Sequence, residues 1–514
     1  MRLELLFIAV LVAGGSPRAA IIPFYVDALN GSDANNGSSP ALAWKTLTHA
    51  LNVVGSPPPH NIHEIRLLPG VYDEANGETF PIVLKQGRWL ASVAGAQPTI
   101  LGSTTTPGPM LRILVDTQPG FPTQNSAVRG LTLRGGNPCV DVDDSGAGQP
   151  LQQYVILEGI EFAYAPGPKL RVFQRNLSNV TLVRSHFSAP ASHMGIEVLA
   201  GDLRVEDAEW DWAAPLAHVA TVPAAGATVS LRRIRARGGS GLSIEPQAGS
   251  LATSVRLEDS HLSQTTNAAV RAVGAAGSAL ELVVERSTIR GALGGGVVAA
   301  GCALTLHDSI LWGSAGDVRL ESPAPSVSAA WCLIGDGTFA GQSGCFAADP
   351  LFRADGTLSA SSPAVDAADP ASSMATLDLT GRSRGVDGDF DTLRHPDLGA
   401  VEFRPLEVGP VNPGGTLLVS ASGPEGAPVQ VWWTRGHLSP APYATSFGLI
   451  ELQRDRAQLL TSLLAGDATA VIWMRAVPAD PALVGRTFAF QARVATGWTP
   501  TEAWTNAVQV TVTP

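Results

Sequence analysis

The chain has 514 residues, of which 34 are basic and 45 acidic, so its formal net charge is −11. This balance disfavours a nucleic-acid partner, because phosphate binding needs a basic face. Hydrophobic residues make up 45% of the chain, and its 54 glycines and 38 prolines stay below the share that signals disorder. The composition therefore predicts a folded, turn-rich chain.

The first residues have the pattern of a secretory signal peptide. Arg2 precedes an apolar run from Leu5 to Ala13, and small residues with Pro17 follow it. The run is too short for a transmembrane helix, which needs about 20 residues, and no later stretch reaches that length. We expect residues 1–20 to form the signal peptide. The rest of the chain should lack a transmembrane segment and be secreted or lie at the cell surface, as in bacterial proteins of this type.

An internal repeat dominates the middle of the chain. Each unit has eight positions, as in the stretch from Val180 to Phe187. Positions 1, 3 and 8 are apolar, positions 4 and 5 are turn residues, position 6 is a small or apolar residue that we call the anchor, and positions 2 and 7 can hold any residue. Apolar residues alternate on both sides of a two-residue corner such as Glu258-Asp259, which predicts strand, bend, strand. Nine anchors follow one another at spacings of 22 to 29 residues: Leu131, Ile160, Ser185, Ala208, Ile234, Ser260, Ser287, Ser309 and Cys332.

Units of this size must stack on one another. A single strand pair cannot bury its apolar face alone, so each anchor should lie above the last at the ~4.8 Å spacing of neighbouring strands. A β-propeller also repeats, but its blades need roughly 40–50 residues. We therefore expect residues 126–348 to form the repeats of a parallel β-helix.

The segment before the repeat contains Tyr25-Val-Asp27, Asn30-Gly-Ser-Asp33, Trp44-Lys-Thr46 and Leu68-Pro-Gly-Val-Tyr72. It resembles the opening of secreted bacterial right-handed β-helix proteins of the pectin-lyase-like type, where it occurs in a polysaccharide lyase family and in domains of unknown function. The resemblance implies that residues 21–125 form an N-terminal cap and the first coils.

An open solenoid end exposes unpaired strand edges, so the terminal units must differ from the rest. Leu47, Ala50, Leu51 and Val54 lie at helical spacing. They predict a short amphipathic helix over residues 46–54 that covers the N-terminal end of the stack.

Three stretches follow the repeat: Asp349-Pro-Leu-Phe352, Ser362-Pro-Ala-Val-Asp366 and Asp397-Leu-Gly-Ala-Val-Glu402. Together with Asp378 and Arg384 they resemble the choice-of-anchor Q domain, which closes the C-terminal end of such helices. The resemblance implies that residues 349–404 are the closing segment.

Short alternating strands separated by Gly- and Pro-rich turns occupy residues 405–514, and they predict a β-sandwich of immunoglobulin-like size. The predicted fold class is all-β: a right-handed parallel β-helix followed by this small C-terminal sandwich.

Polar residues at matching offsets from successive anchors should lie side by side on the outside of the stack. Asp141, Lys169, His193 and His218 lie 8 to 10 residues past their anchors. Such a face would suit a polysaccharide lyase, in which Ca²⁺ neutralises a uronate and a base of lowered pKa abstracts the neighbouring proton. The candidate catalytic residues are Lys169, Arg171, His193 and His218, the candidate substrate ligands are Asp141 and Arg175, and the candidate metal ligands are Asp143 and Asp144.

The alternative is that the stretch from Asp141 to Asp144 is an exposed Gly-rich turn and Lys169 a solvated loop residue. The lyase motifs are not readable in this stretch. The motif set of the pectin-hydrolysing β-helix family does not occur as a set. No nucleophile elbow, P-loop or dinucleotide fingerprint occurs either.

Two further groups bear on ligands and redox chemistry. Asp387, Asp389 and Asp391 occupy every second position, as the carboxylate ligands do in Ca²⁺-binding loops, and they are candidate metal ligands. A solvent-exposed acidic turn has the same pattern. Cys332 and Cys345 lie close together around a Gly-Asp-Gly turn, so an exported chain should join them by a disulfide. Ca²⁺ is the only cofactor that the sequence indicates.

Two functions remain open. The first is a non-catalytic, exported or cell-surface protein that binds polysaccharide or serves as a scaffold, and the second is a polysaccharide lyase or related enzyme that uses the face of Asp141 and Lys169. We favour the first, because no complete catalytic set can be read. The expected partner is a polysaccharide or a cell-surface glycan.

Overall fold

The structure is a computed structural model, and the predicted signal peptide up to residue 19 lies outside the part that it describes. No helix in the described part is long and apolar enough to cross a membrane. The structure describes residues 20–514 except 56, 58–60, 97–98, 104–106, 115–124, 144–152, 175–177, 189–193, 212–214, 375, 390–392, 423–426, 441–442, 446–447, 454–455, 465–470 and 496–501.

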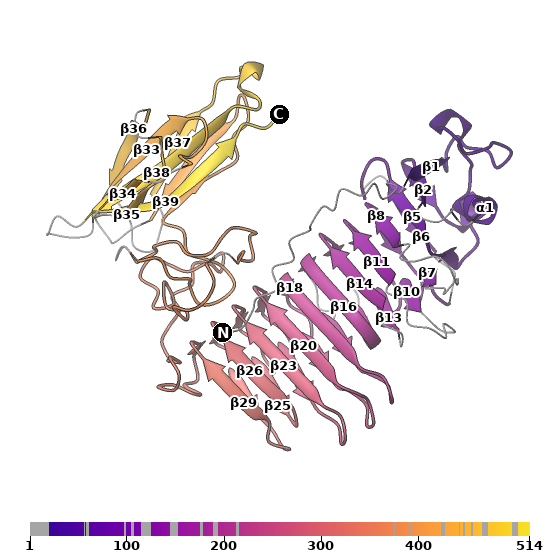
Figure 1. Cartoon of the computed structure of the whole chain (residues 1–514), viewed down its shortest axis with the longest axis horizontal. Helices are drawn as coiled ribbons and strands as arrows, with labels where there is room; N and C mark the ends of the chain where they lie inside the picture. The colour runs from indigo at the N-terminus through magenta and orange to yellow at the C-terminus, as the bar shows by residue number, and fades with distance from the viewer. Residues whose placement is uncertain are drawn as a thin grey trace, which may run out of the picture.

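Residues 21–334 form a parallel β-solenoid with three faces, in which each strand pairs with the equivalent strand one coil later (Figure 1). The first face consists of β1 (Ile21–Val26), β2 (Ile62–Leu67), β5 (Arg88–Ser92), β8 (Ser126–Arg129), β11 (Gln153–Glu158), β14 (Ser178–Val183), β16 (Ile196–Trp210), β18 (Ala227–Arg237), β20 (Thr253–Glu258), β23 (Leu280–Glu285), β26 (Ala303–His307) and β29 (Ser326–Ala330). The predicted parallel architecture is confirmed.

The other two faces use shorter strands, and β16 and β18 run on from one face to the next. The second face consists of β3 (Gly70–Tyr72), β6 (Thr99–Gly102), β9 (Thr132–Arg134), β12 (Glu161–Phe162), β15 (His186–Phe187), the later parts of β16 and β18, β21 (His261–Ser263), β24 (Thr288–Arg290), β27 (Ile310–Trp312) and β30 (Leu333–Ile334). The third face consists of β4 (Ile82–Leu84), β7 (Leu111–Leu114), β10 (Val140–Asp143), β13 (Leu170–Phe173), the start of β16, β17 (Ala217–Val219), β19 (Leu242–Ile244), β22 (Val270–Val273), β25 (Val297–Ala300) and β28 (Val318–Leu320).

The corner between the first and second faces explains the repeat. All nine predicted anchors are at most 3% exposed, and the residue before each anchor has a φ between 46° and 62°. This left-handed residue turns the chain so that the anchor side chain points into the core. Where the anchor is serine, its hydroxyl accepts a hydrogen bond from the neighbouring coil: the amides of Ile234, Ser260 and Ser287 donate to Ser260, Ser287 and Ser309 at 3.0 to 3.2 Å.

One continuous core fills the solenoid, with buried apolar side chains from Val26 to Cys345. Equivalent positions of three coils place Phe162, Phe187 and Trp210 in a stack, with ring centroids 4.6 and 4.0 Å apart. Such ladders of like side chains follow directly from the in-register parallel pairing.

The N-terminal end of the solenoid carries the predicted cap (Figure 1). Thr46 is the N-cap of helix α1 (Leu47–Val53), and its side chain accepts a hydrogen bond from the His49 amide at 3.1 Å. Leu47, Ala50 and Leu51 of this helix are buried, so the predicted amphipathic helix is confirmed. The short 3-10 helices of this region are η1 (Pro40–Leu42) and η2 (Glu74–Asn76).

The closing segment, residues 349–404, lies against the second face of the later coils. Among its described residues the only β pairings are two isolated bridges, Phe352 with Leu358 and Leu377 with Ser383. Its apolar side chains, including Leu398, form a second core with Ile310 and Leu333 of the solenoid. Because Ile310 and Leu333 point outward from the coils, the closing segment buries apolar surface that the solenoid alone would expose.

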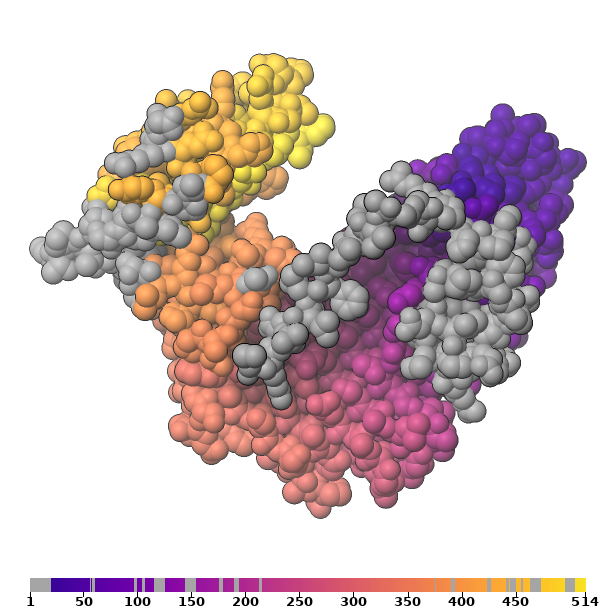
Figure 2. Space-filling model, in the orientation of Figure 1, coloured from indigo at the N-terminus to yellow at the C-terminus, as the bar shows by residue number. Residues whose placement is uncertain are grey.

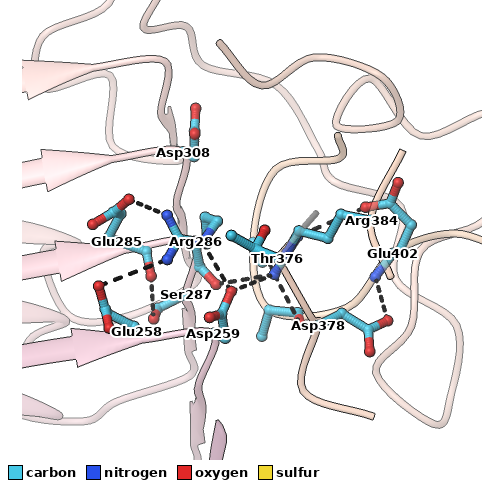
Figure 3. Close-up of polar contacts among 12 residues, drawn as sticks. Glu258, Asp259, Glu285, Arg286, Ser287, Asp308, Thr376, Asp378, Arg384 and Glu402 are labelled. Carbon is cyan, nitrogen blue, oxygen red and sulfur yellow. Dashed lines mark hydrogen bonds and ion pairs between the residues drawn. The ribbon is translucent and has the colours of Figure 1, made fainter. Parts of the chain in front are cut away.

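A buried ion-pair network fixes this contact (Figure 3). Arg384 is fully buried, and its Nη2 lies 3.1 Å from Asp259 Oδ1 at a coil corner and 2.8 Å from the Gly399 carbonyl oxygen. Its Nη1 lies 3.7 Å from Glu402 Oε2. Asp259 also contacts Arg286, whose Nε lies 2.9 Å from Oδ1. Both carboxylates and the guanidinium are therefore paired, which a buried charge requires.

The C-terminal residues form two antiparallel sheets around a separate core, as the predicted sandwich requires. Figure 2 shows the closing segment between this domain and the later coils. The strands are β31 (Leu406–Val408), β32 (Thr416–Ala421) and β37 (Val471–Ala476) in one sheet; β36 (Gln458–Leu464), β33 (Pro428–Arg435), β38 (Thr487–Ala495) and β39 (Glu502–Thr511) in the other; and the hairpin β34 (Tyr443–Thr445) with β35 (Gly448–Ile450), besides the 3-10 helix η3 (Pro481–Leu483).

We expect Arg384→Met to lower the free energy of unfolding by about 3 kcal/mol, because it leaves Glu402 and several carbonyl groups buried without their cation. The matched control is Arg382→Met, since Arg382 is 50% exposed and pairs with an exposed Glu407, so its loss should cost less than about 1 kcal/mol. Urea unfolding measures both changes. Equal effects would show that the buried network does not secure the closing segment.

Candidate functional site

A ladder of outward side chains runs along the third face. Inward positions of its strands carry valine, leucine, isoleucine and alanine, and the residue between two of them points outward. Parallel pairing in register places these outward residues one above another. In coil order they are Arg112, Asp141, Arg171, Glu197, His218, Ser243, Arg271, Val298 and Arg319.

The charged side chains in the first three coils of the ladder pair with one another. Asp141 is 1% exposed, and both of its oxygens lie 2.9 Å from Arg171, at Nε and Nη2. Arg112 reaches Asp141 at 3.8 Å and donates to Asp143 at 2.5 Å. Two arginines thus already neutralise both aspartates, so these carboxylates are poorly placed to take up a metal or a substrate cation.

Lys169 does not belong to the outward ladder. It precedes β13, is 2% exposed, and lies near the buried Cys139. Burial lowers the pKa of the Lys169 amine, and it raises the pKa of the Cys139 thiol to about 12. The predicted base therefore has a lowered pKa but little access to solvent.

The other predicted residues do not converge with Lys169 on one point. Arg171 and His218 share the ladder with Asp141, but His218 is three coils from Asp141, which is roughly 14 Å at the strand spacing. Asp144, Arg175 and His193 lie outside the described residues. The offsets thus place Asp141 and His218 on one face, at separate positions along it.

A groove of about 420 Å³ opens farther along the same face. Four charged side chains form three ion pairs across it: Arg271 Nε lies 3.3 Å from Glu245, Arg271 Nη1 lies 3.4 Å from Glu321, and Arg319 also lies 3.4 Å from Glu321. All four are 38% to 49% exposed, so their ion pairs are weak and open to exchange with a ligand. The other polar groups that line the groove are His218, Ser240, Ser243 and Asn267.

The acidic run in the closing segment lies beside Asp366, which the sequence analysis placed in the closing segment but did not name as a metal ligand. Carboxylate oxygens of Asp366, Asp387 and Asp389 all lie within 4.8 Å of one another, and Asp391 is outside the described residues. Asp366 Oδ2 accepts hydrogen bonds from the amides of Gly388 and Asp389 at 2.7 and 2.8 Å. Three hard oxygen donors at this spacing fit Ca²⁺.

Burial raises the pKa of Asp366 to about 8, and the nearby charges of Asp389 and Glu402 add to the effect. Burial together with the Glu402 charge also raises the pKa of Asp397. A cation bound in the cluster would offset this repulsion.

All four cysteines are buried thiols, so the predicted bridge between Cys332 and Cys345 is absent from the structure. The two side chains do lie together, and the hydrogen bond between them lowers the pKa of Cys345. Cys332 also contacts the Ala330 carbonyl oxygen at 3.2 Å. The two cysteines therefore lie close together, but the predicted disulfide between them is wrong.

Residues 29–134 match a family described as a protein of unknown function, DUF1565. The match covers the cap and the coils up to β9, so it supports the predicted resemblance of the N-terminal segment to domains of unknown function. A comparison with curated protein sequences finds no match. The resemblance of residues 349–404 to a choice-of-anchor Q domain stays a prediction.

Among solved structures, full-length tailspike protein 2 from an Escherichia coli O157:H7 bacteriophage is similar at 10% identity and a TM-score of 0.28, over 95% of this chain and 64% of the tailspike. The enzymatically active domain of tailspike protein 2 from bacteriophage CBA120 is similar at 10% identity and a TM-score of 0.25, over 86% of this chain and 71% of that domain. These values carry no argument about function, and the fold assignment rests on the strand pairing.

We expect millimolar Ca²⁺ to raise the melting temperature relative to chelator, because an ion that binds only the folded chain stabilises it. Asp389→Ala should remove the shift, since Asp389 supplies one of the three clustered carboxylates. The control is Asp211→Ala, an exposed aspartate outside the cluster that should leave the shift unchanged. Identical melting curves in Ca²⁺ and chelator would reduce the cluster to an acidic turn.

The raised pKa of Asp366 also predicts a pH dependence in chelator. Between its ordinary value of 3.8 and about 8, the folded chain keeps a proton that the unfolded chain has lost, so stability should fall as the pH rises through this window. Asp366→Asn should flatten the fall. Urea unfolding across this range measures it, and an unchanged slope in the variant would show that Asp366 does not titrate in this window.

Proposed function

We propose that this chain is an exported or cell-surface β-helix protein that binds a polysaccharide along the third face of its solenoid without catalysing a reaction on it. The observation that carries the proposal is the groove beside Arg271, where partly exposed charged and polar side chains from successive coils meet. Hydroxyl-rich ligands need donors and acceptors together, and arginine, glutamate, serine and asparagine supply both.

The regular spacing of the ladder suits a linear polymer. Polar groups recur at every coil from Glu197 to Arg271, so several sugar units can be contacted at the same time. Linked contacts of this kind raise the overall affinity even when each one is weak. The ion pairs that cross the groove keep the charged side chains extended over it, and they are exposed enough to exchange partners.

The lyase alternative lacks such support. A proton-abstracting lysine must reach the substrate, whereas Lys169 is 2% exposed. A carboxylate that binds substrate or Ca²⁺ needs free oxygens, whereas the predicted substrate ligand Asp141 gives both of its oxygens to Arg171 and the predicted metal ligand Asp143 is paired with Arg112. Non-catalytic binding is therefore the better proposal.

The test is affinity electrophoresis of the mature chain in gels that contain a panel of neutral and acidic polysaccharides. Removing Arg271 and Arg319 together by alanine substitution should weaken binding tenfold or more, which is about 1.4 kcal/mol. The matched control is Arg256→Ala, because Arg256 is 47% exposed and paired with two glutamates, but lies on the first face.

Two results would contradict the proposal. One is a failure of the binding test, either through an equal loss of binding in the control and in the double variant or through no binding of any polysaccharide by the parent chain. The other is turnover: a polymer that is shortened with the appearance of unsaturated ends would make the chain a lyase.

A further inference from the structure

A second cleft, of about 480 Å³, lies where the closing segment meets the end of the second face. It is separate from the third-face groove and shares no lining residue with it. The solenoid contributes Gln264, Arg290 and Trp312 to its lining, and the closing segment contributes Asp349, Phe352 and Arg353.

Arginines without an ion pair lie at this cleft. In the described part of the solenoid and closing segment, every arginine lies within 4.0 Å of a carboxylate oxygen except Arg88, Arg237, Arg290 and Arg353. Arg290 and Arg353 line the cleft, and Arg237 donates to its Gln264 at 2.9 Å. In a chain with a net charge of −11, such a local excess of cations needs a reason.

Arg290 is placed to receive an anion. Its guanidinium lies over the Phe352 ring, 5.1 Å from the centroid, and this contact holds the side chain without using its hydrogen-bond donors. Burial and the charge of Arg237 lower the pKa of Arg290 and outweigh the opposite effect of the Asp355 charge, so an anionic partner would be favoured there.

The neighbouring groups do not neutralise Arg290. His261 is 8% exposed and lies close to Arg290, since a Cβ at Gly356 would be 2.8 Å from Arg290 Nη2 and 3.1 Å from His261 Cε1. Burial, with Arg290 and Arg235 adding to it, lowers the pKa of His261 to about 4, so the imidazole is neutral at pH 7. Its buried Nε2 finds no partner among the described residues.

The carboxylates at the rim are engaged locally. Asp349 accepts a hydrogen bond from the Leu351 amide at 2.9 Å. Asp355 lies near both arginines, but its Oδ1 accepts from the Thr357 amide at 2.9 Å and from the Thr357 hydroxyl at 2.7 Å. Neither carboxylate comes within 4.0 Å of Arg290 or Arg353 nitrogens, so the planar donors of Arg290 stay available.

We propose that this cleft binds the anionic group, carboxylate or sulfate, of an acidic saccharide unit, with the sugar ring against Trp312. Arginine recognises such planar or tetrahedral anions through paired N–H donors, and an aromatic face takes up the apolar side of a sugar ring. This proposal rests on the proposed function and deepens it, because it makes the bound polysaccharide acidic. A duplex nucleic acid would need a much longer basic surface than this cleft offers.

The experiment measures binding of the mature chain to polygalacturonate, dextran sulfate, neutral dextran and duplex DNA by titration calorimetry at fixed ionic strength. We expect Arg290→Gln to weaken binding of polygalacturonate or dextran sulfate tenfold or more, and the preferred polymer identifies the anion. Trp312→Ala should weaken binding of the same polymer. Arg204→Gln is the control, because Arg204 is 56% exposed, paired with Glu206 and distant from the cleft in the chain. Thermal melting checks that each variant is folded.

The other outcomes separate this inference from the proposed function. Binding of acidic polymer that survives Arg290→Gln but is lost when Arg271 and Arg319 are replaced would overturn the cleft and leave the proposed function intact. Tighter binding of neutral dextran than of the acidic polymers would also overturn the cleft proposal and leave the proposed function intact. Binding of DNA as tight as that of the acidic polysaccharide would overturn recognition of a sugar. No binding to any polysaccharide would overturn both proposals.

Discussion

In-register parallel stacking of the coils is the constraint on which the rest of this structure depends. Each strand takes its hydrogen bonds from the coils on either side, so a side chain that points outward in one coil lies next to its equivalent in the following one. The left-handed residue before each anchor, such as Asp259 or Arg286, keeps this register at the corner. The core and the polar ladder of the third face are both consequences of it.

Stacking also leaves apolar surface exposed near both ends of the solenoid, and the flanking segments cover it. Helix α1 covers the first coil, and the closing segment covers apolar side chains that point outward near the last one. Asp259 belongs both to the corner ladder and to the buried pair with Arg384, so the register of the coils fixes where the closing segment sits. The second cleft forms along this boundary, which is why it draws residues from both parts.

The sequence predicts the features that repeat with every coil, but it does not predict the positions that depend on the length of the loops between strands. Alternation and a recurring corner were enough to place all nine anchors, and helical spacing placed α1. Counting residues from the anchors also found Asp141 and His218 on one ladder, and the same count from later anchors would have found Ser243 and Arg319. It failed for Lys169, because the ladder residue of that coil is Arg171, which lies 11 residues past its anchor. No local pattern links Asp366 to Asp389, or Arg290 to Arg353, because the fold brings these residues together from separate segments of the chain.

The central claim, that a polysaccharide lies along the third face, is tested most directly by carboxyl footprinting. Carbodiimide labelling followed by mass spectrometry reports the accessibility of Glu245 and Glu321 in the groove and of Glu209, an exposed glutamate of the second face. The account predicts that a bound polysaccharide slows labelling of Glu245 and Glu321 and leaves Glu209 unchanged. Protection of Glu209 alone, or labelling of the two groove glutamates at the same rate with and without ligand, would contradict it.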